Sequence, residues 1–502
     1  MTNYRFILIT VLFLPFGVFA QNEGDILRYS EFGHGGSAKF LAMSGAVGAL
    51  GAEFSGLNYN PAGLGLFRKH QMSLTPTFTS TSANTDFLNN TNEELKLGFK
   101  FNNLGIALAN KPESSTDWKF INVAVNYSVL NDFNSEAILQ SGGNTTGQTL
   151  NGNQSLAETF VEEANGFNTI ELEETRPFSA DLAFLTYLID PQENDSLSYV
   201  SRVQNEQIRL NRTINEKGRY GETAISVGAN YLQKLFLGAS IGIPSVKYKR
   251  KVNHEEKTLD ENAELDEFTF QENVDVSGSG INLKLGAIFQ ATKFMRIGVA
   301  WQSGSSISLR EEFDTEIRTR FNQSPDGNSL SFNAESPLGV FDYRVVTPGR
   351  IMLSSAFIIG NRASISIDYE RINYQSGRIK PAWDAPESGG NFNEVNNIIS
   401  EVLTSGDRLK LGGEYRFGPW AIRGGYQLIS NPFNRIAVDH QEDSWGFSYG
   451  AGYKTDYWFV DIGISNLRTT RDYYPYSNSN FSEGALIKRK YSMLGITIGT
   501  SF

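Results

Sequence analysis

Apolar and polar residues alternate along most of the chain. In one representative stretch, Ile121, Val123 and Val125 share one face, whereas Asn122 and Asn126 share the other. A side-chain period of two is typical of a β-strand that separates two different environments. The pattern therefore predicts an all-β protein, although a water-soluble sandwich would show the same alternation.

The lengths of the connections favour a transmembrane barrel over a sandwich. Even-numbered connections are mostly tight, as at residues 232–235, 360–362 and 417–419, whereas odd-numbered connections are expected to be long. A barrel segregates its loops in this way because one set of turns crosses the membrane during assembly and stays small. The chain is accordingly predicted to form a 14-stranded antiparallel transmembrane β-barrel. Its strands are expected to begin near Met72, Leu97, Phe120, Glu222, Phe236, Ser277, Arg296, Gly349, Arg362, Asp407, Pro419, Asp443, Tyr457 and Lys488.

The last strand and the aromatic residues agree with a barrel in a membrane. Leu494, Ile496 and Ile498 alternate with glycine and threonine up to the terminal Phe502. An amphipathic strand that stops on an aromatic residue resembles the signal that the outer-membrane assembly machinery recognises. An aromatic girdle at the membrane–water interface is predicted from rings beside the short turns, namely Tyr231, Phe294, Trp420 and Trp458.

Residues 1–20 have the features of a secretory signal peptide. Arg5 precedes an apolar run from Phe6 to Phe16, and a small-residue cleavage site ends at Ala20. The run is too short to span ~30 Å of hydrocarbon comfortably. Export with removal of this segment is therefore expected. Beyond Ala20 no run approaches the length of about 18 apolar residues that a membrane helix needs.

Composition narrows the class of function. The net charge of -11 argues against nucleic acid as a partner, and the absence of cysteine excludes disulfides. No G-x-S-x-G sequence is present, and the histidines lack the spacing of a metal site. We expect no metal, no cofactor and no enzymatic activity. The four histidines are His34, His70, His254 and His440.

The segment before the first strand is different in character. Residues 21–70 do not alternate, and residues 40–51 at their centre are small and apolar. Small residues allow backbone segments to pack closely in a confined space. A turn is predicted at the sequence that follows, which consists of Asn60, Pro61, Ala62 and Gly63.

Together these features resemble the FadL/TodX/OmpP1 family of outer-membrane transporters for hydrophobic compounds. The resemblance rests on the Asn60-Pro61-Ala62 motif, the fourteen strands and the terminal Phe502. Further matches are residues 280–286 leading to residues 296–300, and residues 347–350 with the sequence Thr-Pro-Gly-Arg. The resemblance covers the whole mature chain.

The resemblance implies an amino-terminal hatch, residues 21–70, inside a barrel formed by residues 71–502 in the bacterial outer membrane. It implies passive uptake of hydrophobic small molecules such as long-chain fatty acids. In the family, ligand leaves through a lateral gap made by a kink in one strand. Outer-membrane lipid, lipopolysaccharide and the barrel-assembly machinery are the other expected partners. An alternative function stays open, because relatives of this fold serve as docking components of protein-secretion or assembly complexes without small-molecule transport.

The longest connection, residues 131–220, supplies the candidate ligand surface. Residues 155–164 and 179–190 have helical character, and each segment opens on a serine that suits a helix cap. Their apolar faces are either buried against each other and the barrel rim or form an entry groove. The candidate ligand-binding residues are Phe160, Leu182, Phe184, Leu185 and Leu188.

Overall fold

The computed structural model describes residues 23–32, 35–113, 116–142, 147–204, 206–360, 362–383, 392–434 and 442–502. The expected signal peptide, residues 1–20, lies outside these ranges, as do His34 and His440. Among the described residues, no helix is both long and apolar enough to cross a membrane.

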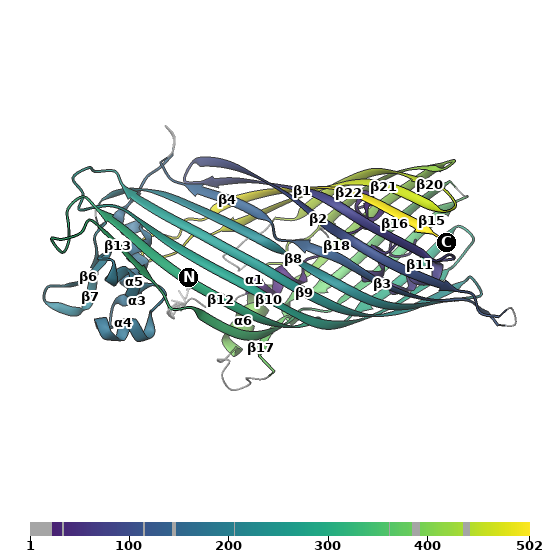
Figure 1. The fold of residues 1–502 in the computed structure, drawn as a ribbon, viewed down its shortest axis with the longest axis horizontal. Coiled ribbons are helices and arrows are strands. Elements are labelled where there is room, and N and C mark those ends of the chain that lie inside the picture. Colours follow the sequence, from purple (N-terminus) through teal and green to yellow (C-terminus); the bar gives the residue numbers. More distant parts are fainter. Residues whose placement is uncertain are drawn as a thin grey trace, which may run out of the picture.

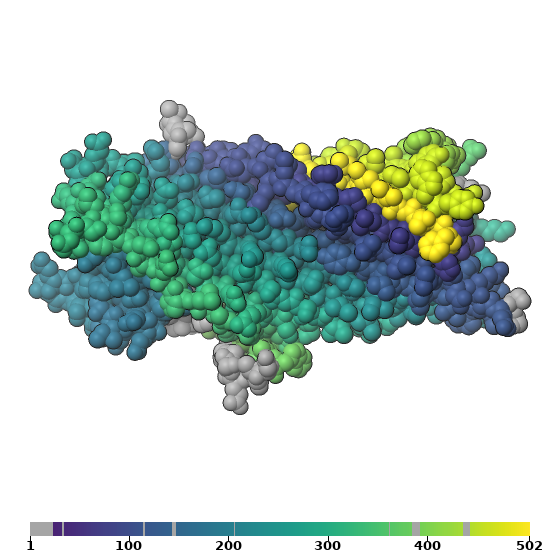
Figure 2. All heavy atoms as spheres, viewed as in Figure 1, coloured from purple at the N-terminus to yellow at the C-terminus, as the bar shows by residue number. Residues whose placement is uncertain are grey.

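The strands form one closed antiparallel barrel with 14 strand positions, as predicted (Figure 1). The first strand pairs with the second on one side and with the last strand on the other, which closes the wall. In Figure 2 the yellow last strand lies directly against the dark first strands. Ten positions are single strands, namely β1 (Gln71–Phe87), β2 (Asn90–Asn110), β8 (Gln207–Tyr231), β9 (Leu235–Thr258), β10 (Leu265–Gln290), β18 (Ser405–Phe417), β19 (Trp420–Ile429), β20 (Ser444–Lys454), β21 (Trp458–Tyr473) and β22 (Ala485–Ser501).

Four positions are built from successive shorter segments. The third consists of β3 (Trp118–Asp132), β4 (Ser135–Gln140) and β5 (Leu150–Asn151), all paired with β8. The seventh consists of β11 (Met295–Gln302) and β12 (Ser306–Phe321), which both pair with β10. The eighth consists of β13 (Ser331–Glu335), β14 (Gly339–Val346) and β15 (Arg350–Ile359), and the ninth of β16 (Ala363–Asn373) and β17 (Arg378–Pro381).

The two faces of each strand meet different surroundings. In β3, Ile121, Val123 and Val125 are 44–46% exposed and point outward, whereas Asn122 and Asn126 are almost fully buried and point into the lumen. Apolar side chains that are exposed on the outer wall suit a lipid environment. Rings lie at the end with the short turns, where Trp118 contacts Tyr231 and Trp420 contacts Tyr453. The alternation and the girdle are therefore as predicted.

The structure contradicts the prediction that every odd-numbered connection is long. The first odd-numbered connection consists of Leu88 and Asn89 alone, both with positive φ, so the prediction of a long loop there is wrong. The strands of this region continue well beyond the membrane, and β8, β9 and β10 have 25, 24 and 26 residues. About ten residues suffice to cross the bilayer. The polar residues in this region, for which loops were predicted, therefore belong to strands that extend into the water outside the membrane.

The remaining elements lie inside the barrel or at its extracellular end (Figure 1). The predicted hatch segment contains α1 (Glu23–Ser30), α2 (Ala38–Ala42), η1 (Ser55–Asn58) and η2 (Pro61–Leu66). An extracellular cap follows β5 and contains η3 (Gly152–Gln154), α3 (Leu156–Ala164), α4 (Thr169–Thr175), α5 (Ala180–Leu185), β6 (Ile189–Gln192) and β7 (Asp195–Ser201). On the side where the strands are shorter, η4 (Tyr374–Ser376) and α6 (Asn393–Val402) cover the rim.

Candidate functional site

The hatch is held in the lumen by contacts between main chains. The turn at Pro61 lies against Gly238 of β9, where a Cβ would overlap the Pro61 carbonyl group. Gly228 of β8 accommodates Leu64 and Gly65 in the same way. Only glycine leaves room for such an approach. Glycines on the opposite wall receive α2 and the turn after it, namely Gly412, Gly425, Gly450, Gly463 and Gly495.

Asn60 organises the predicted hatch motif. Its Oδ1 accepts a hydrogen bond from the amide of Ala62 (3.1 Å), and its Nδ2 donates one to the carbonyl of Gly48 (2.8 Å). One side chain thus caps η2 and ties it to the small-residue segment that precedes it. Pro61 is the first residue of η2, a position where its missing N–H leaves nothing unsatisfied. We propose that the motif fixes the hatch inside the barrel.

We expect Asn60→Ala to loosen the hatch without unfolding the barrel. The substitution leaves two buried polar groups unpaired, each worth about 1–3 kcal/mol. Hydrogen exchange of hatch amides should accelerate, while amides of β8 and β9 stay protected. Asn262→Ala, in an exposed turn at the extracellular end, is the matched control. Unchanged exchange in the hatch would contradict the proposed role.

A buried carboxylate gives the hatch an internal support. Glu53 accepts hydrogen bonds from the hydroxyl of Ser37 (2.5 Å) and from the amide of Gly56 (2.6 Å). Burial raises the pKa of Glu53 above its ordinary value, and these two hydrogen bonds oppose that rise. Asp368 of β16 accepts from the amide of Gly48 (2.8 Å), which connects the hatch to the wall.

The wall has a break between its second and third strands. The pairing of β2 with β3 runs from Asn110 to Asn103, and among the described residues it goes no further. Residues 90–101 of β2 pair with β1 and with no other strand in the part of the chain that the structure describes. Beyond Ser128 the third position bends, because its register with β8 shifts between Val129 and Asn131 and because β4 pairs with β8 alone. The sequence did not locate this kink.

Lysine side chains bridge the break in place of main-chain hydrogen bonds. The Lys100 ammonium lies 2.5 Å from Asp132, at the end of β3. Lys96 donates to the side chain of Asn215 (2.8 Å) and to the carbonyl of Ser135 (3.2 Å). The two edges of the break are therefore joined by flexible side chains, which can part without disrupting a sheet.

The hatch contacts both edges of the same break. Asn102 of β2 donates to the carbonyl of Gly36 (3.3 Å). On the other edge, Gly35 packs so closely on Val129 that a Cβ would overlap the Val129 carbonyl oxygen. A shift of the hatch segment at Gly35 and Gly36 would therefore alter the break directly.

Above the hatch, the lumen holds a charged chamber. A cavity of about 500 Å³ lies beside α1. A smaller cavity of about 130 Å³ shares four charged lining residues with it and extends to the kink at Asp132 and Ser135. Three carboxylates, Glu216, Glu272 and Asp472, line the larger cavity. They are outnumbered by five arginines, namely Arg28, Arg212, Arg250, Arg471 and Arg489.

Two of the chamber arginines have a buried N–H group without a hydrogen-bond partner among the described residues. Arg489 donates to Glu216 (3.2 Å), and Arg212 and Arg250 share the carboxylate of Glu272. The Nε atoms of Arg250 and Arg489 are nevertheless buried and have no hydrogen-bond partner among the described residues. Unsatisfied donors beside an open cavity suit an anionic ligand, since charge-assisted hydrogen bonds are the stronger ones.

The five candidate ligand-binding residues lie in the extracellular cap. Phe160, Leu182 and Leu188 are fully buried in an apolar cluster that joins the cap to the upper strands. Phe184 is partly buried against that cluster, and Leu185 is 53% exposed. Helix α3 begins after the predicted cap Ser155, whereas α5 ends at Leu185 and is shorter than predicted. Ligand binding at these residues stays a prediction.

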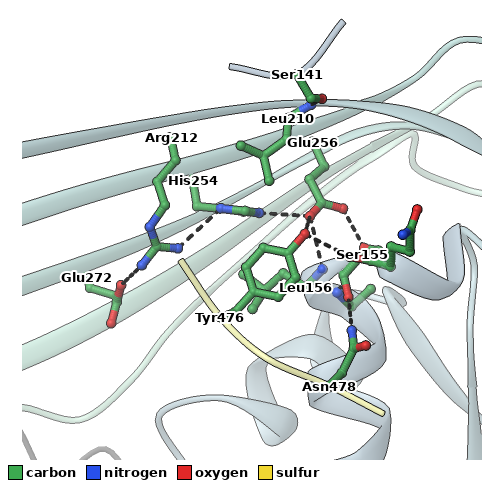
Figure 3. A network of polar contacts seen from close by, with 12 residues as sticks. Ser141, Ser155, Leu156, Leu210, Arg212, His254, Glu256, Glu272, Tyr476 and Asn478 are labelled. Carbon is green, nitrogen blue, oxygen red and sulfur yellow. Dashed lines mark hydrogen bonds and ion pairs between the residues drawn. The ribbon is translucent and has the colours of Figure 1, made fainter. Parts of the chain in front are cut away.

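A polar network fastens the cap to the barrel (Figure 3). Glu256 of β9 accepts from the amide of Leu156 at the start of α3 (3.0 Å) and contacts the hydroxyl of Ser155. The same carboxylate lies 2.9 Å from His254, whose ring contacts Arg212 (3.2 Å). Tyr476, from the connection between β21 and β22, reaches Glu256 as well (3.4 Å). The network connects the cap to the chamber through Arg212.

The arrangement defines a class of protein. A closed barrel with an apolar outer wall and an internal amino-terminal plug is a transmembrane barrel of the outer-membrane type. Across the described ranges, no group of histidine and carboxylate side chains could hold a metal ion.

Two solved bacterial structures resemble this chain. A FadL homologue from Pseudomonas aeruginosa matches 94% of this chain and 100% of its own at 12% identity and a TM-score of 0.55. The toluene transporter TodX from Pseudomonas putida matches 94% of this chain and 99% of its own at 12% identity and a TM-score of 0.49. No family model and no curated protein matches the sequence. The likeness to the FadL homologue establishes the fold.

Proposed function

We propose that this protein is an outer-membrane channel for passive uptake of hydrophobic small molecules that carry an anionic headgroup. Long-chain fatty acids are the simplest members of this class. The observation that supports the proposal is the position of the charged chamber, which extends to the kink and to the break between β2 and β3. A ligand held in the chamber is therefore next to one edge of the break in the wall.

The lining of the chamber favours an amphiphile over a neutral hydrocarbon. Buried arginines with unused donors gain hydrogen bonds from a carboxylate and gain nothing from a hydrocarbon ring. The apolar part of the ligand would pack on the cluster around α1, which includes Ile26, Leu27 and Phe133. Leu185 on the exposed surface of the cap is our candidate for first contact.

Release through the break agrees with the energetics of an apolar ligand. A chain of about sixteen methylenes gains on the order of 13 kcal/mol on burial at ~0.8 kcal/mol each, so a closed site would release it slowly. An exit into the bilayer keeps the chain in an apolar environment throughout. Displacement of the segment at Gly35 and Gly36 is the proposed gate, because it contacts both edges.

The test is to identify what the purified protein carries. After extraction in a mild non-ionic detergent, mass spectrometry should find fatty acids or other anionic amphiphiles enriched over neutral lipids, relative to a mock purification from cells that lack the protein. Enrichment of neutral hydrocarbons alone would overturn the choice of ligand class. A barrel without small molecules but with a stoichiometric protein partner would favour the docking function.

A further inference from the structure

The outer faces of β8 and β9 change character above the apolar belt. Outward residues Ile225 and Ile241 are opposite each other, and Thr223 is opposite Ile243. Further toward the extracellular end the outward residues are basic and exposed. We call this group the cationic ladder; it consists of Lys217, Arg219, Lys247, Lys249 and Lys251.

The register places like charges directly opposite each other. Arg219 pairs with Lys247, and Lys217 pairs with Lys249. Like charges in directly opposed positions of an antiparallel pair destabilise it. Lys249 has an ion pair with Asp275 of β10, and in the part of the chain that the structure describes, the other four have none. An external anion would remove the repulsion.

The cationic ladder begins at the outer edge of the lipid headgroups. Lys247 is four residues beyond Ile243, the last outward apolar residue of β9. At ~3.3 Å per residue along a strand that is tilted by about 40°, the ladder begins about 10 Å above the apolar belt. The headgroup region of a bilayer is about 5–8 Å deep on each side of the hydrocarbon, so Arg219 and Lys247 lie at its outer edge.

The wall has one hollow beside the ladder and another below it. A hollow of about 640 Å³ lies against Lys217, Lys249 and Lys251. Asparagine amides and three carboxylates line its other side, namely Asp275, Glu312 and Asp314. The phosphate is therefore expected on the side of the ladder away from these carboxylates, at Lys217, Arg219 and Lys247. Nearer the periplasmic end of the same strands, an apolar groove of about 430 Å³ is lined by Ile225, Val227, Ile241 and other apolar residues of the neighbouring strands. In Figure 2 strands β8 to β10 form the teal middle part of the wall.

We propose that the cationic ladder and the apolar groove form a binding site for one anionic lipid of the outer leaflet. The lipid phosphate lies on the ladder, where lysine and arginine donate charge-assisted hydrogen bonds. Its acyl chains follow the outer wall into the groove. The lipid source is favoured over free phosphate because the basic and apolar surfaces are continuous on the same two strands. The site faces the membrane and is independent of what passes through the lumen.

The test compares lipids that differ only in their phosphates. The full-length protein in non-ionic detergent with EDTA is titrated with bisphosphorylated lipid A and with its dephosphorylated form, and retained lipid is measured by native mass spectrometry. We expect preferential retention of the phosphorylated form. The triple variant K217Q/R219Q/K247Q should weaken that retention by about a hundredfold, since each basic residue contributes about fivefold near an anionic surface.

A matched control lies on the same strands. Arg209 and Lys257 are also opposite each other and exposed, but they lie well beyond the headgroup layer. R209Q/K257Q should therefore retain lipid A like the wild type. Equal retention of both lipid forms by the wild type, or an equal loss in the control variant, would overturn the proposal. Competition by millimolar inorganic phosphate would show a free-anion site and overturn the lipid assignment. Unchanged mobility of the folded barrel in gels confirms that each variant is folded.

Discussion

Tethering β2 to β3 across the break in the wall should stop ligand uptake. Lys100 and Asp132 form an ion pair there, and the chain has no native cysteine. We expect a Lys100→Cys/Asp132→Cys variant, joined by a bifunctional thiosulfonate about as long as a lysine side chain, to lose uptake by at least about tenfold, because opening becomes limiting. Uptake of a labelled fatty acid by cells is the measurement, and reductant should restore it.

A second tether controls for the chemistry. Lys488 of β22 and Asp86 of β1 form an ion pair (2.8 Å) between strands that are already hydrogen-bonded. Cysteines at this pair should accept the same reagent with little effect on uptake. Normal uptake in the tethered Lys100→Cys/Asp132→Cys variant would show that ligand does not leave through the break.

Removing one chamber arginine should weaken the binding of anionic ligands and leave the binding of neutral ligands unchanged. Arg489→Gln deletes a cation that lines both cavities and leaves Glu216 to repel an incoming carboxylate. Hydrogen bonds to charged groups contribute about 1.5–3 kcal/mol, so affinity for laurate should fall by about 10- to 100-fold. Methyl laurate, which lacks the charge, should bind the variant and the wild type alike. Calorimetry in non-ionic detergent measures both ligands.

An arginine outside the lumen serves as the control. Arg318 of β12 is exposed and pairs with Glu316 (2.6 Å). Arg318→Gln should bind both ligands like the wild type. Equal losses of the acid and the ester in Arg489→Gln would mean that the residue supports the shape of the chamber and does not recognise charge.

The number of strands was predictable because apolar and polar side chains alternate in every strand segment that has one face toward lipid and the other toward the lumen. The burial of Asn122 and the exposure of Val123 follow from that alternation alone. The aromatic residues beside the short turns were predictable for the same reason, since a ring at the interface has a fixed place along the strand.

The kink was not predicted, although the sequence carries a trace of it. Val129 and Leu130 are consecutive apolar residues, and Asn131 and Asp132 are consecutive polar ones, so the period of two fails there. All four are buried, as expected where a strand leaves the wall and bends into the protein. A failed period also marks the end of a strand, which is consistent with the predicted loop from Asn131 onward.

The chamber was missed because its residues lie on strand segments outside the membrane. Arg212 and Glu216 fall within the expected loop 131–220, and Arg250 and Glu272 fall between two predicted strands. Above the bilayer both faces of a strand are polar, so no hydrophobic period remains to show which side chains point inward. Only the pairing of β8, β9 and β10 brings these charges together.

The two seams of the first hairpin differ greatly in length. The closing seam with β22 runs from Gln71 to Asp86, whereas the seam between β2 and β3 ends at Asn103. In mechanical terms the barrel is a cylinder with a slit cut from its extracellular rim, and hoop tension concentrates at the tip of such a slit. Lateral pressure in the bilayer therefore acts on the width of this slit more than on any fully hydrogen-bonded seam, and membranes of different stiffness should set different resting widths.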